Sequence, residues 1–424
     1  MRKFCSLLII ASAFFFLSPK SNSAQQLNGS RAKGQVMRPG SSVEHPGDAG
    51  VNAHTHLRML VPSTGQFGNA TLLTATGQPP FLGVFFETPA SIACIYHLVK
   101  NPKPGCNPDE TTEPPTGGGG AIALIDAFDD PTAAADLATF STQFGLPAAN
   151  LTVVFSNGKP AVDPSGGAEI ETSLDIEWAH AMAPKAKLFL VEAPSLRLGD
   201  LFNAILVGAN LVAANGGGEV SMSFGSGEFP QENQLDNVFF NTPGVVYVAS
   251  SGDAPGVQYP SASPNVVSAG GATVSRDSTT GRFLLENTWQ DGGGGPSQVE
   301  LRPSFQNEVR QIVGAARGTP DISFDANPNT GVWVFDTNPV FGQGWFVLGG
   351  TSVAAPSLAG IINAAGSFRA SSQLENHQIY NHLFDRDALR DIIFGNCGIN
   401  IGDFALPGYD FCTGVGTSQT YEGK

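Results

Sequence analysis

The chain has 424 residues, of which 14% are charged and 41% are hydrophobic, and its formal net charge is −15. This much apolar material can bury a large core, which excludes disorder for most of the chain. A basic nucleic-acid-binding protein is disfavoured as well, because no cluster of Lys and Arg is present to neutralise phosphates. The composition therefore indicates an acidic, glycine-rich globular protein with no nucleic-acid partner.

The first 24 residues have the layout of a secretory signal peptide. Arg2 and Lys3 precede an apolar run over residues 7–17, and small residues follow at positions 21–24. The run is too short to span a bilayer, and no later stretch reaches about 18 continuous apolar residues. We therefore expect residues 1–24 to be removed, the mature protein to be secreted, and no stable membrane insertion after signal cleavage.

Residues 25–87 show no strong periodicity and are predicted to form an N-terminal segment ahead of the main domain, residues 88–424. The segment contains His54 and His56, which could bind a metal, but two histidines without further ligands are more often surface residues. Residues 101–120 are rich in Pro, Thr and Gly, which predicts an exposed linker.

Four cysteines remain once the signal peptide is removed: Cys94, Cys106, Cys397 and Cys412. Four cysteines allow three pairings. The two pairs that are local in sequence, Cys94–Cys106 and Cys397–Cys412, are the simplest expectation for an exported protein in an oxidising compartment. Neither spacing is typical of a zinc site.

From residue 121 onward, short apolar runs alternate with helical patterns. The pattern predicts strands over 121–128, 151–155, 188–193, 220–224 and 244–250, and helices over 131–144, 172–183 and 201–214. This alternation is typical of an α/β fold with a parallel sheet that helices cover on both faces. In such folds the ligand site lies beyond the carboxyl ends of the strands. We therefore expect the chemistry just after Phe128, Phe224 and Ser250.

The sharpest local signal is GGTSVAAP at residues 349–356, which follows a strand-like run at 346–348. The glycines permit a tight turn, and the small residues then open a helix with Ser352 near its N-terminus. Unpaired N–H groups and the helix dipole there can stabilise an oxyanion. A glycine-rich turn with a capping serine is the alternative, but the string is longer than a cap requires. We interpret Ser352 as a nucleophile.

A serine hydroxyl needs a base, and none of the seven histidines lies in the His-Gly-Thr-His box that accompanies such a string in subtilisin-type enzymes. Glu171 and Asp175 are four residues apart and share one face of a predicted helix. Such a pair can share a proton and accept another only while partly ionised, which favours acidic conditions. Taken alone, the pair would be an ordinary solvated helix face; beside the serine motif it is a candidate base.

A third acid, Asp253, follows the strand predicted over 244–250. In its protonated form it could donate a hydrogen bond to a developing oxyanion. An ordinary turn aspartate after a strand is the alternative.

These residues resemble the sedolisin family of serine-carboxyl peptidases, from about residue 88 to residue 416. The shared motifs are ETSLDIEWAHAMAPKAK around Glu171 and Asp175, SSGDAPGVQYPSASPNVVSAGG around Asp253, and GGTSVAAP around Ser352. The resemblance implies a subtilisin-like fold and an endopeptidase that acts in acid on protein or peptide substrates. It implies that Ser352 is the nucleophile, Glu171 the general base, Asp175 the acid that orients Glu171, and Asp253 the oxyanion donor.

The resemblance also implies one structural Ca²⁺ near the C-terminus. The matching positions are Asp391, Ile392, Leu406, Gly408 and Asp410. Two carboxylates with backbone carbonyls and water suit a hard cation that prefers oxygen ligands. Leu406 replaces a glycine of the family pattern, but a carbonyl ligand does not require a particular side chain.

The chain departs from the family pattern at three points, of which the last two motivate a second hypothesis. Asp126 stands where relatives often carry Glu, and Phe224 replaces the Trp of a Ser-Trp-Gly segment, so it cannot donate an indole hydrogen bond. The segment over residues 25–87 is also shorter than the family's usual prodomain, so a full prodomain is expected to be absent or truncated. The alternative is therefore a catalytically inactive, exported binding or surface protein on the same fold. A neutral-pH subtilisin relative conflicts with the missing histidine box.

Overall fold

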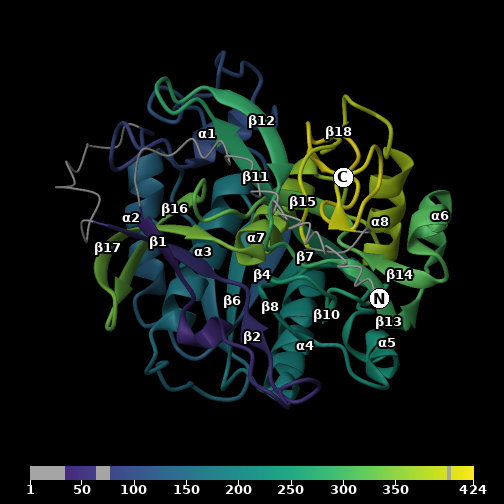
Figure 1. Cartoon of the computed structure of the whole chain (residues 1–424). Helices are drawn as coiled ribbons and strands as arrows, with labels where there is room; N and C mark the ends of the chain where they lie inside the picture. Colours follow the sequence, from purple (N-terminus) through teal and green to yellow (C-terminus); the bar gives the residue numbers. More distant parts are fainter. Residues whose placement is uncertain (1–33, 64–76, 399–402) are drawn as a thin grey trace, which may run out of the picture.

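A mostly parallel sheet runs through the centre of the computed structural model, which describes residues 34–63, 77–398 and 403–424 (Figure 1). The strand order is β18-β19-β15-β11-β9-β7-β4-β6-β5, with β12 paired to β11. The strands are β4 (Ala121–Ala127), β5 (Asn150–Phe155), β6 (Lys187–Ala193), β7 (Gly218–Met222), β9 (Val245–Ser250), β11 (Val267–Arg276), β12 (Phe283–Thr288), β15 (Ile322–Asp325), β18 (Leu389–Arg390) and β19 (Thr417–Ser418). Only the β11–β12 and β18–β19 pairs within this sheet are antiparallel.

Helices cover both faces of this sheet, as the sequence predicts. The helices are α1 (Pro89–Ile95), α2 (Ala133–Phe144), α3 (Gly167–Met182), α4 (Leu198–Ala214), α5 (Asp236–Phe239), α6 (Arg310–Val313), α7 (Thr351–Ala365) and α8 (Ser372–Asn381). In β4, Ile122 and Leu124 pack with α3 and α7, whereas Ala123 and Ile125 pack with α4 on the other face. Because both faces are buried, the strands are continuous apolar runs rather than alternating ones.

Two of the predicted boundaries that differ from the structure bear on the site. Helix α3 begins at Gly167 rather than at residue 172, because Gly166 takes a left-handed conformation (φ 70°) that starts the helix earlier. The strand predicted over 220–224 is two strands: β7 ends at Met222, and Phe224 begins β8 (Phe224–Gly227) in a different sheet. Helix α3 therefore carries Glu171 inside its second turn and not at its start.

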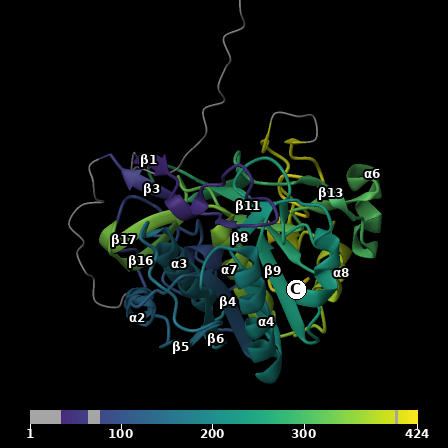
Figure 2. The same cartoon turned by 90° about the horizontal axis from the view of Figure 1, so that it is seen from below.

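Two smaller sheets bring the N-terminal strands against the body of the molecule. The first has the order β1-β3-β17-β16 and the second β10-β8-β2, and every pair in them is antiparallel. Their strands, apart from β8, are β1 (Gly34–Met37), β2 (His54–Thr55), β3 (Arg58–Pro62), β10 (Gln258–Tyr259), β16 (Val332–Asn338) and β17 (Gly342–Gly349). Figure 2 shows these purple N-terminal strands lying across one end of the molecule, beside α3, α7 and β8.

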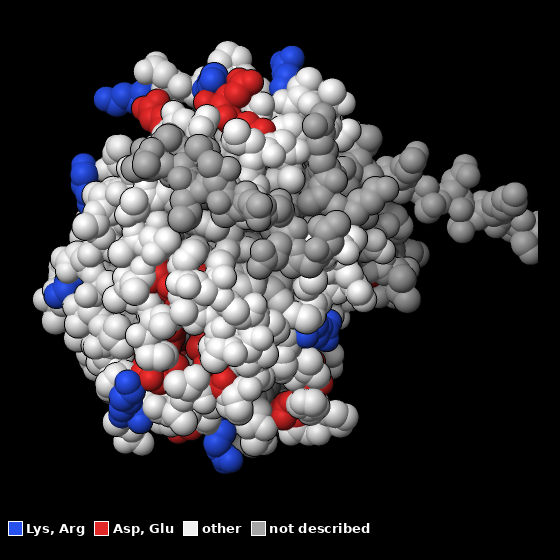
Figure 3. Space-filling model, turned by 90° about the vertical axis from the view of Figure 1, so that its left-hand side faces the viewer, with Lys and Arg blue, Asp and Glu red and all other residues white. Residues whose placement is uncertain are grey.

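The remaining short elements lie around these sheets. They are the 3-10 helices η1 (Gly40–Ser42), η2 (Glu232–Gln234) and η3 (Ser304–Val309), and the strand pair β13 (Gly295–Leu301) and β14 (Ala316–Thr319). None of the helices described is long and apolar enough to cross a bilayer. The signal peptide expected over residues 1–24 lies outside the described residues. On the face that Figure 3 shows, the visible Lys and Arg side chains lie near the edge, whereas Asp and Glu atoms also appear away from it.

Both disulfides expected from the sequence are present, Cys94–Cys106 and Cys397–Cys412. The Cys94–Cys106 bond makes the loop that follows α1 differ from the exposed linker predicted there. Residues 101–104 are exposed, as predicted for a linker, but residues 106–108 are buried. The disulfide attaches this loop to α1, so it is not a free linker along its whole length.

Candidate active site

The candidate residues gather at the carboxyl edge of the central sheet, where the sequence analysis expects them. Asp126 lies near the end of β4, Ser223 follows β7, and Asp253 follows β9 by three residues. Helix α7 opens at this edge and carries Ser352 as its second residue. Parallel strands end on the same edge, so residues far apart in sequence converge there.

The turn before α7 depends on glycine. Gly350 has φ 97°, and a side chain there would collide with the carbonyl oxygen of His56 and with Asp253 Oδ2. The chain then enters α7, and Ser352 is fully buried. Its backbone N–H donates to the His56 carbonyl at 3.1 Å, and its hydroxyl donates to the Ser223 carbonyl at 3.3 Å.

Three buried acids form a group next to this serine: Glu171 and Asp175 from α3, and Asp126 from β4. Asp175 accepts a hydrogen bond of 2.7 Å from the Ser223 hydroxyl. Neither oxygen of Glu171 has a hydrogen bond of ordinary geometry. The group contains no basic side chain, so its members repel one another when ionised.

This arrangement shifts the pKa of each acid upward. Burial raises the pKa of Glu171 well above its ordinary value, the adjacent Ser352 hydroxyl lowers it in part, and Asp126 raises it further. The pKa of Asp175 rises because of burial and because of the charges of Asp126 and Glu171. The pKa of Asp126 rises to about 7, chiefly through burial. The three carboxyls therefore share protons at pH values where free carboxyls are ionised.

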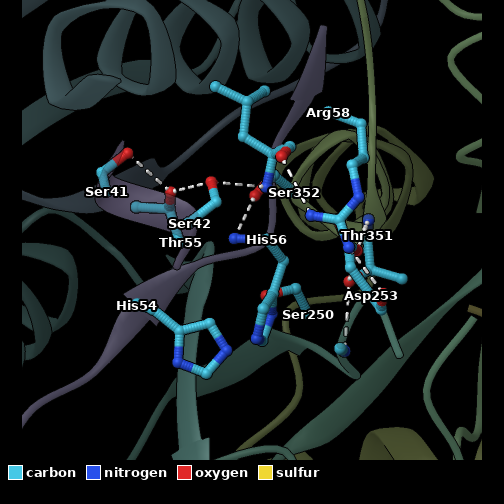
Figure 4. Close-up of polar contacts among 12 residues, drawn as sticks. Ser41, Ser42, His54, Thr55, His56, Arg58, Ser250, Asp253, Thr351 and Ser352 are labelled. Carbon is cyan, nitrogen blue, oxygen red and sulfur yellow. Dashed lines mark hydrogen bonds and ion pairs between the residues drawn. The ribbon is translucent and has the colours of Figure 1, made fainter. Parts of the chain in front are cut away.

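Asp253 is buried in a different environment. Its Oδ1 accepts hydrogen bonds from the backbone N–H and the hydroxyl of Thr351, at 2.8 Å and 3.0 Å. Arg58 Nη1 lies 3.4 Å from Oδ2, and Nη2 donates to the Asp253 carbonyl at 2.7 Å (Figure 4). Burial raises the pKa of Asp253 to about 6, against the lowering effect of Arg58.

The prediction that His54 and His56 are surface residues is wrong, since both are buried. The alternative of a metal site is not supported either, because both ring nitrogens of His56 have protein partners. Nδ1 lies 2.6 Å from Ser250 Oγ, and Nε2 lies 2.6 Å from Gln258 Oε1. The His56 ring is therefore held away from the Ser352 hydroxyl and is not its base.

Sequence reasoning missed three participants: Arg58, His56 and the Ser223 hydroxyl. Arg58 and His56 reach the site only because β2 and β3 pair with distant strands, which no local pattern shows. The role of Ser223 could have been predicted, because Ser223 lies near the end of the strand predicted over 220–224, at the sheet edge where the chemistry is expected. Phe224, expected to weaken the acid network, is buried in the core beside α4.

The five residues expected to bind calcium lie in one C-terminal region. Asp391 Oδ2 accepts the Gly408 N–H at 3.0 Å, and Asp391 Oδ1 is buried without a hydrogen bond. Asp410 accepts the N–H groups of Leu406, Cys412 and Thr413. Burial raises the pKa of Asp391, and it raises that of Asp410 to about 6.

No family model matches the chain. Kumamolisin from Bacillus sp. (strain MN-32) is 30% identical over 347 residues, which is 71% of this chain and 58% of kumamolisin. Sedolisin from Pseudomonas sp. (strain 101) is 33% identical over 174 residues, 38% of this chain and 28% of sedolisin. This chain is a kumamolisin-like member of the sedolisin family. It covers less than two thirds of the length of either relative.

The fold of this sedolisin-family chain is subtilisin-like. It superposes on Pseudomonas sedolisin, solved in complex with two molecules of pseudo-iodotyrostatin, with a TM-score of 0.64 at 23% identity. The match covers 79% of this chain and 95% of that structure. Sphericase matches with a TM-score of 0.51 at 19% identity, over 79% of this chain and 98% of its own. The α/β fold class predicted from the sequence is confirmed.

Proposed function

We propose that this protein is an exported serine-carboxyl endopeptidase that hydrolyses peptide bonds in acid. The observation that carries the proposal is the convergence of three groups at one edge of the sheet. These are the Ser352 hydroxyl, the Glu171 carboxyl beside it, and the protonatable Asp253 carboxyl. The kumamolisin and sedolisin relatives support the same activity.

Each of these groups has a role in acyl transfer. Ser352 Oγ attacks the carbonyl carbon of the substrate, and Glu171 takes its proton. Asp175 stabilises the protonated Glu171, while its own carboxyl is oriented by the Ser223 hydroxyl. The Ser352 N–H and a protonated Asp253 donate to the oxyanion. Glu171 then protonates the leaving amine, and water hydrolyses the acyl-enzyme by the reverse route.

The acid preference follows from the two kinds of carboxyl. Asp253 donates only while protonated, so activity should fall as the pH rises through about 6, the pKa of its carboxyl. The group of Asp126, Glu171 and Asp175 must hold at least one negative charge to accept a proton, so activity should also fall as the pH drops and the group becomes fully protonated. Because both requirements must be met, activity plotted against pH should be bell-shaped, with its maximum below pH 7.

One experiment separates the peptidase from an inactive protein on the same fold. Phe224, which replaces the Trp of the family pattern, motivates the second possibility. The wild-type chain should degrade a denatured protein at acidic pH, and Ser352→Ala should abolish this. A peptide aldehyde should block the wild type by forming a hemiacetal with Ser352. Equal degradation by Ser352→Ala, or no degradation and no aldehyde binding by the wild type, would refute the proposal.

Export is part of the proposal. The two disulfides support it, because such bonds persist in oxidising compartments. Mass spectrometry of protein secreted by an expression host should find a chain that lacks residues 1–24. Retention of the full chain inside cells would contradict export.

The last part of the proposal is one structural Ca²⁺ bound in the C-terminal region. Asp391 and Asp410 would supply carboxylates, and Ile392, Leu406 and Gly408 carbonyl oxygens. The buried, unbonded Asp391 Oδ1 fits a cation, because an unpaired buried carboxylate oxygen is costly. The bound ion would supply positive charge that joins this loop to the fold and would take no part in the reaction.

Chelation tests this site. Removing Ca²⁺ from purified protein should lower its melting temperature, and added Ca²⁺ should restore it. Asp391→Asn should reduce the response. Asp385→Asn is the control, since Asp385 belongs to a separate group of possible ligands with His382 and Glu422. If only Asp385→Asn weakens the response, the ion binds at that other group.

A further inference from the structure

Three side chains that can bind a metal lie together where α8 ends, and none of them is assigned above to catalysis or to Ca²⁺. They are His382, Asp385 and Glu422, and one ligand atom of each lies within 4.8 Å of the other two. Among the described residues, no other group of three or more His, Cys, Asp or Glu side chains converges in this way. The net charge of −15 favours the approach of a cation.

The backbone fixes two of these residues on one turn. His382 is the C-cap of α8, and its N–H donates to the Ile379 carbonyl at 3.1 Å. The Asp385 N–H donates to the His382 carbonyl at 2.8 Å. The Asp385 carbonyl in turn accepts the N–H groups of Ala388 and Leu389, at 3.2 Å and 2.9 Å. An ion that binds here therefore finds two ligands already held in place, which reduces the entropy lost on binding.

The C-terminal segment brings Glu422 to this turn. The Gln419 N–H donates to the Ala388 carbonyl at 2.9 Å. Gly423 packs against the His382 ring, since a Cβ there would lie 3.2 Å from the ring Cγ. Figures 1 and 2 both show the end of the chain beside α8. The third ligand thus comes from a part of the chain whose main chain is also held.

The hydrogen bond of the His382 ring leaves one nitrogen available to an ion. Nδ1 lies 2.9 Å from the carbonyl oxygen of Gln378, one turn earlier in α8. Because a carbonyl only accepts, Nδ1 carries the proton of the neutral ring and Nε2 keeps its lone pair. Histidines that bind metals usually donate their other N–H to a carbonyl or a carboxylate in this way. This contact does not involve the carboxylates, and it independently points to a ligand at Nε2.

The two carboxylates have no cation paired with them. None of the ion pairs found among the described residues includes Asp385 or Glu422. The ammonium group of Lys424 donates instead to the main-chain carbonyl of Glu422, at 3.0 Å. Asp385 Oδ1 accepts the Asp387 N–H at 3.0 Å, which orients this carboxyl group. The negative charges of both side chains therefore remain for an ion to neutralise.

We propose that His382, Asp385 and Glu422 form a Zn²⁺ site that joins the C-terminal segment to α8. One imidazole nitrogen with two carboxylate oxygens suits Zn²⁺, whereas Ca²⁺ and Mg²⁺ prefer oxygen ligands alone. Bonds of about 2.1 Å place tetrahedral ligands roughly 3.4 Å apart, so the exposed Glu422 side chain moves onto the ion by rotating its own torsions. Water takes the fourth position. The site is independent of the proposed peptidase activity.

Equilibrium dialysis against Zn²⁺ at pH 7.5, where imidazole can bind as the neutral ring, tests the site. The full chain is purified without a polyhistidine tag. Metal analysis should find one Zn²⁺ per wild-type chain, and a tenfold excess of Ca²⁺ should not displace it. His382→Gln and Glu422→Gln should each raise the Kd at least about tenfold, no less than the loss of an outer-shell partner costs. His377→Gln is the control on α8, because that ring contacts Ser304 at 3.0 Å.

Three outcomes of this experiment would overturn the proposal. They are a wild type that binds no Zn²⁺, a His382→Gln variant that binds it as tightly as the wild type, and displacement of Zn²⁺ by an equal concentration of Ca²⁺.

Hydrogen exchange provides a second measurement, which reports where the ion acts. Zn²⁺ should slow exchange of the amides over residues 419–423 by at least about tenfold, because it joins this segment to α8. Asp385→Asn should lose the protection while it keeps the wild-type melting temperature without Zn²⁺, which shows that the variant folds. Asp391→Asn, at the expected Ca²⁺ site, should keep the protection. Protection near the exposed His45 or His97 instead would overturn the assignment.

Discussion

Two sets of buried carboxyls adjoin Ser352, and they differ in the charges around them. The set of Asp126, Glu171 and Asp175 contains only acids: Asp126 raises the pKa values of both others, and Glu171 raises that of Asp175. Asp253 instead faces Arg58 at 3.4 Å and accepts two hydrogen bonds from Thr351. The carboxyls of the first set therefore keep their protons to higher pH, while Asp253 loses its proton more readily. The two sets therefore titrate differently, and the roles of Glu171 as base and Asp253 as acid rest on where each carboxyl lies around Ser352.

Removing the base should have the largest effect. Glu171→Gln should lower kcat by about 10³-fold, because a neutral amide cannot take the serine proton. Glu177→Gln is a matched control on the same helix, since Glu177 accepts the Phe335 N–H at 3.0 Å and does not face Ser352. Steady-state kinetics on a denatured protein or a peptide measure both. If the two variants lose activity equally, the loss reflects damage to α3 and not removal of a base.

Changing Asp253 should have a smaller effect that depends on pH. Asp253→Ala should lower kcat by about 10²- to 10³-fold, the usual result of removing one oxyanion donor. Asp253→Asn keeps an N–H donor at every pH, so it should retain more activity and lose the decline near pH 6. Full pH–rate profiles of both variants check this. A wild-type decline that persists unchanged in Asp253→Asn would mean that another group causes it.

Replacing Arg58 tests how its positive charge affects the pKa of Asp253. Arg58→Gln removes a positive charge that lowers the pKa of Asp253, so this pKa should rise. Asp253 would then stay protonated to higher pH, so peptide hydrolysis near pH 7 should become faster. The other charges facing Asp253 are Arg38 and Glu171. Arg38→Gln, in an exposed position, should change the rate less.

The parts of the site that could be predicted from sequence are those that short motifs build. GGTSVAAP specifies a glycine turn and a helix start, and the spacing of Glu171 and Asp175 places them on one helical face. These features depend on φ angles and helix periodicity, which a few residues determine. The central strands were also predictable, because burial on both faces gives continuous apolar runs.

The N-terminal segment was not predictable for the opposite reason. β2 contains two residues and has no periodicity to read, and its partner β8 lies far along the chain. The burial of His54 and His56 arises from this pairing, so local polarity indicated a surface instead. The early start of α3 at Gly167 was missed for a local reason, since a left-handed glycine such as Gly166 can end a loop or sit within one.

The smallest expected effect concerns folding stability, which should depend on pH because several buried acids without a paired cation have raised pKa values. Burial raises the pKa of Glu192 to about 8, of Glu232 to about 8 and of Asp336 to about 7. These groups keep their protons in the folded state at pH values where the unfolded chain has lost them. Their contribution to stability is therefore present below pH 4 and is lost as the pH rises toward 8.

The melting temperature of Ser352→Ala, used to prevent self-digestion, should accordingly fall between pH 4.5 and pH 8. A fall of at least about 3 °C corresponds to roughly 1 kcal/mol for a domain of this kind. Glu192→Gln, which imitates the protonated acid, should reduce the fall, because a neutral amide has no proton to lose. Glu110→Gln, at an exposed acid, should leave it unchanged. A melting temperature that rises over this range would mean that groups with lowered pKa values in the folded state, and not these buried acids, dominate the pH dependence of folding.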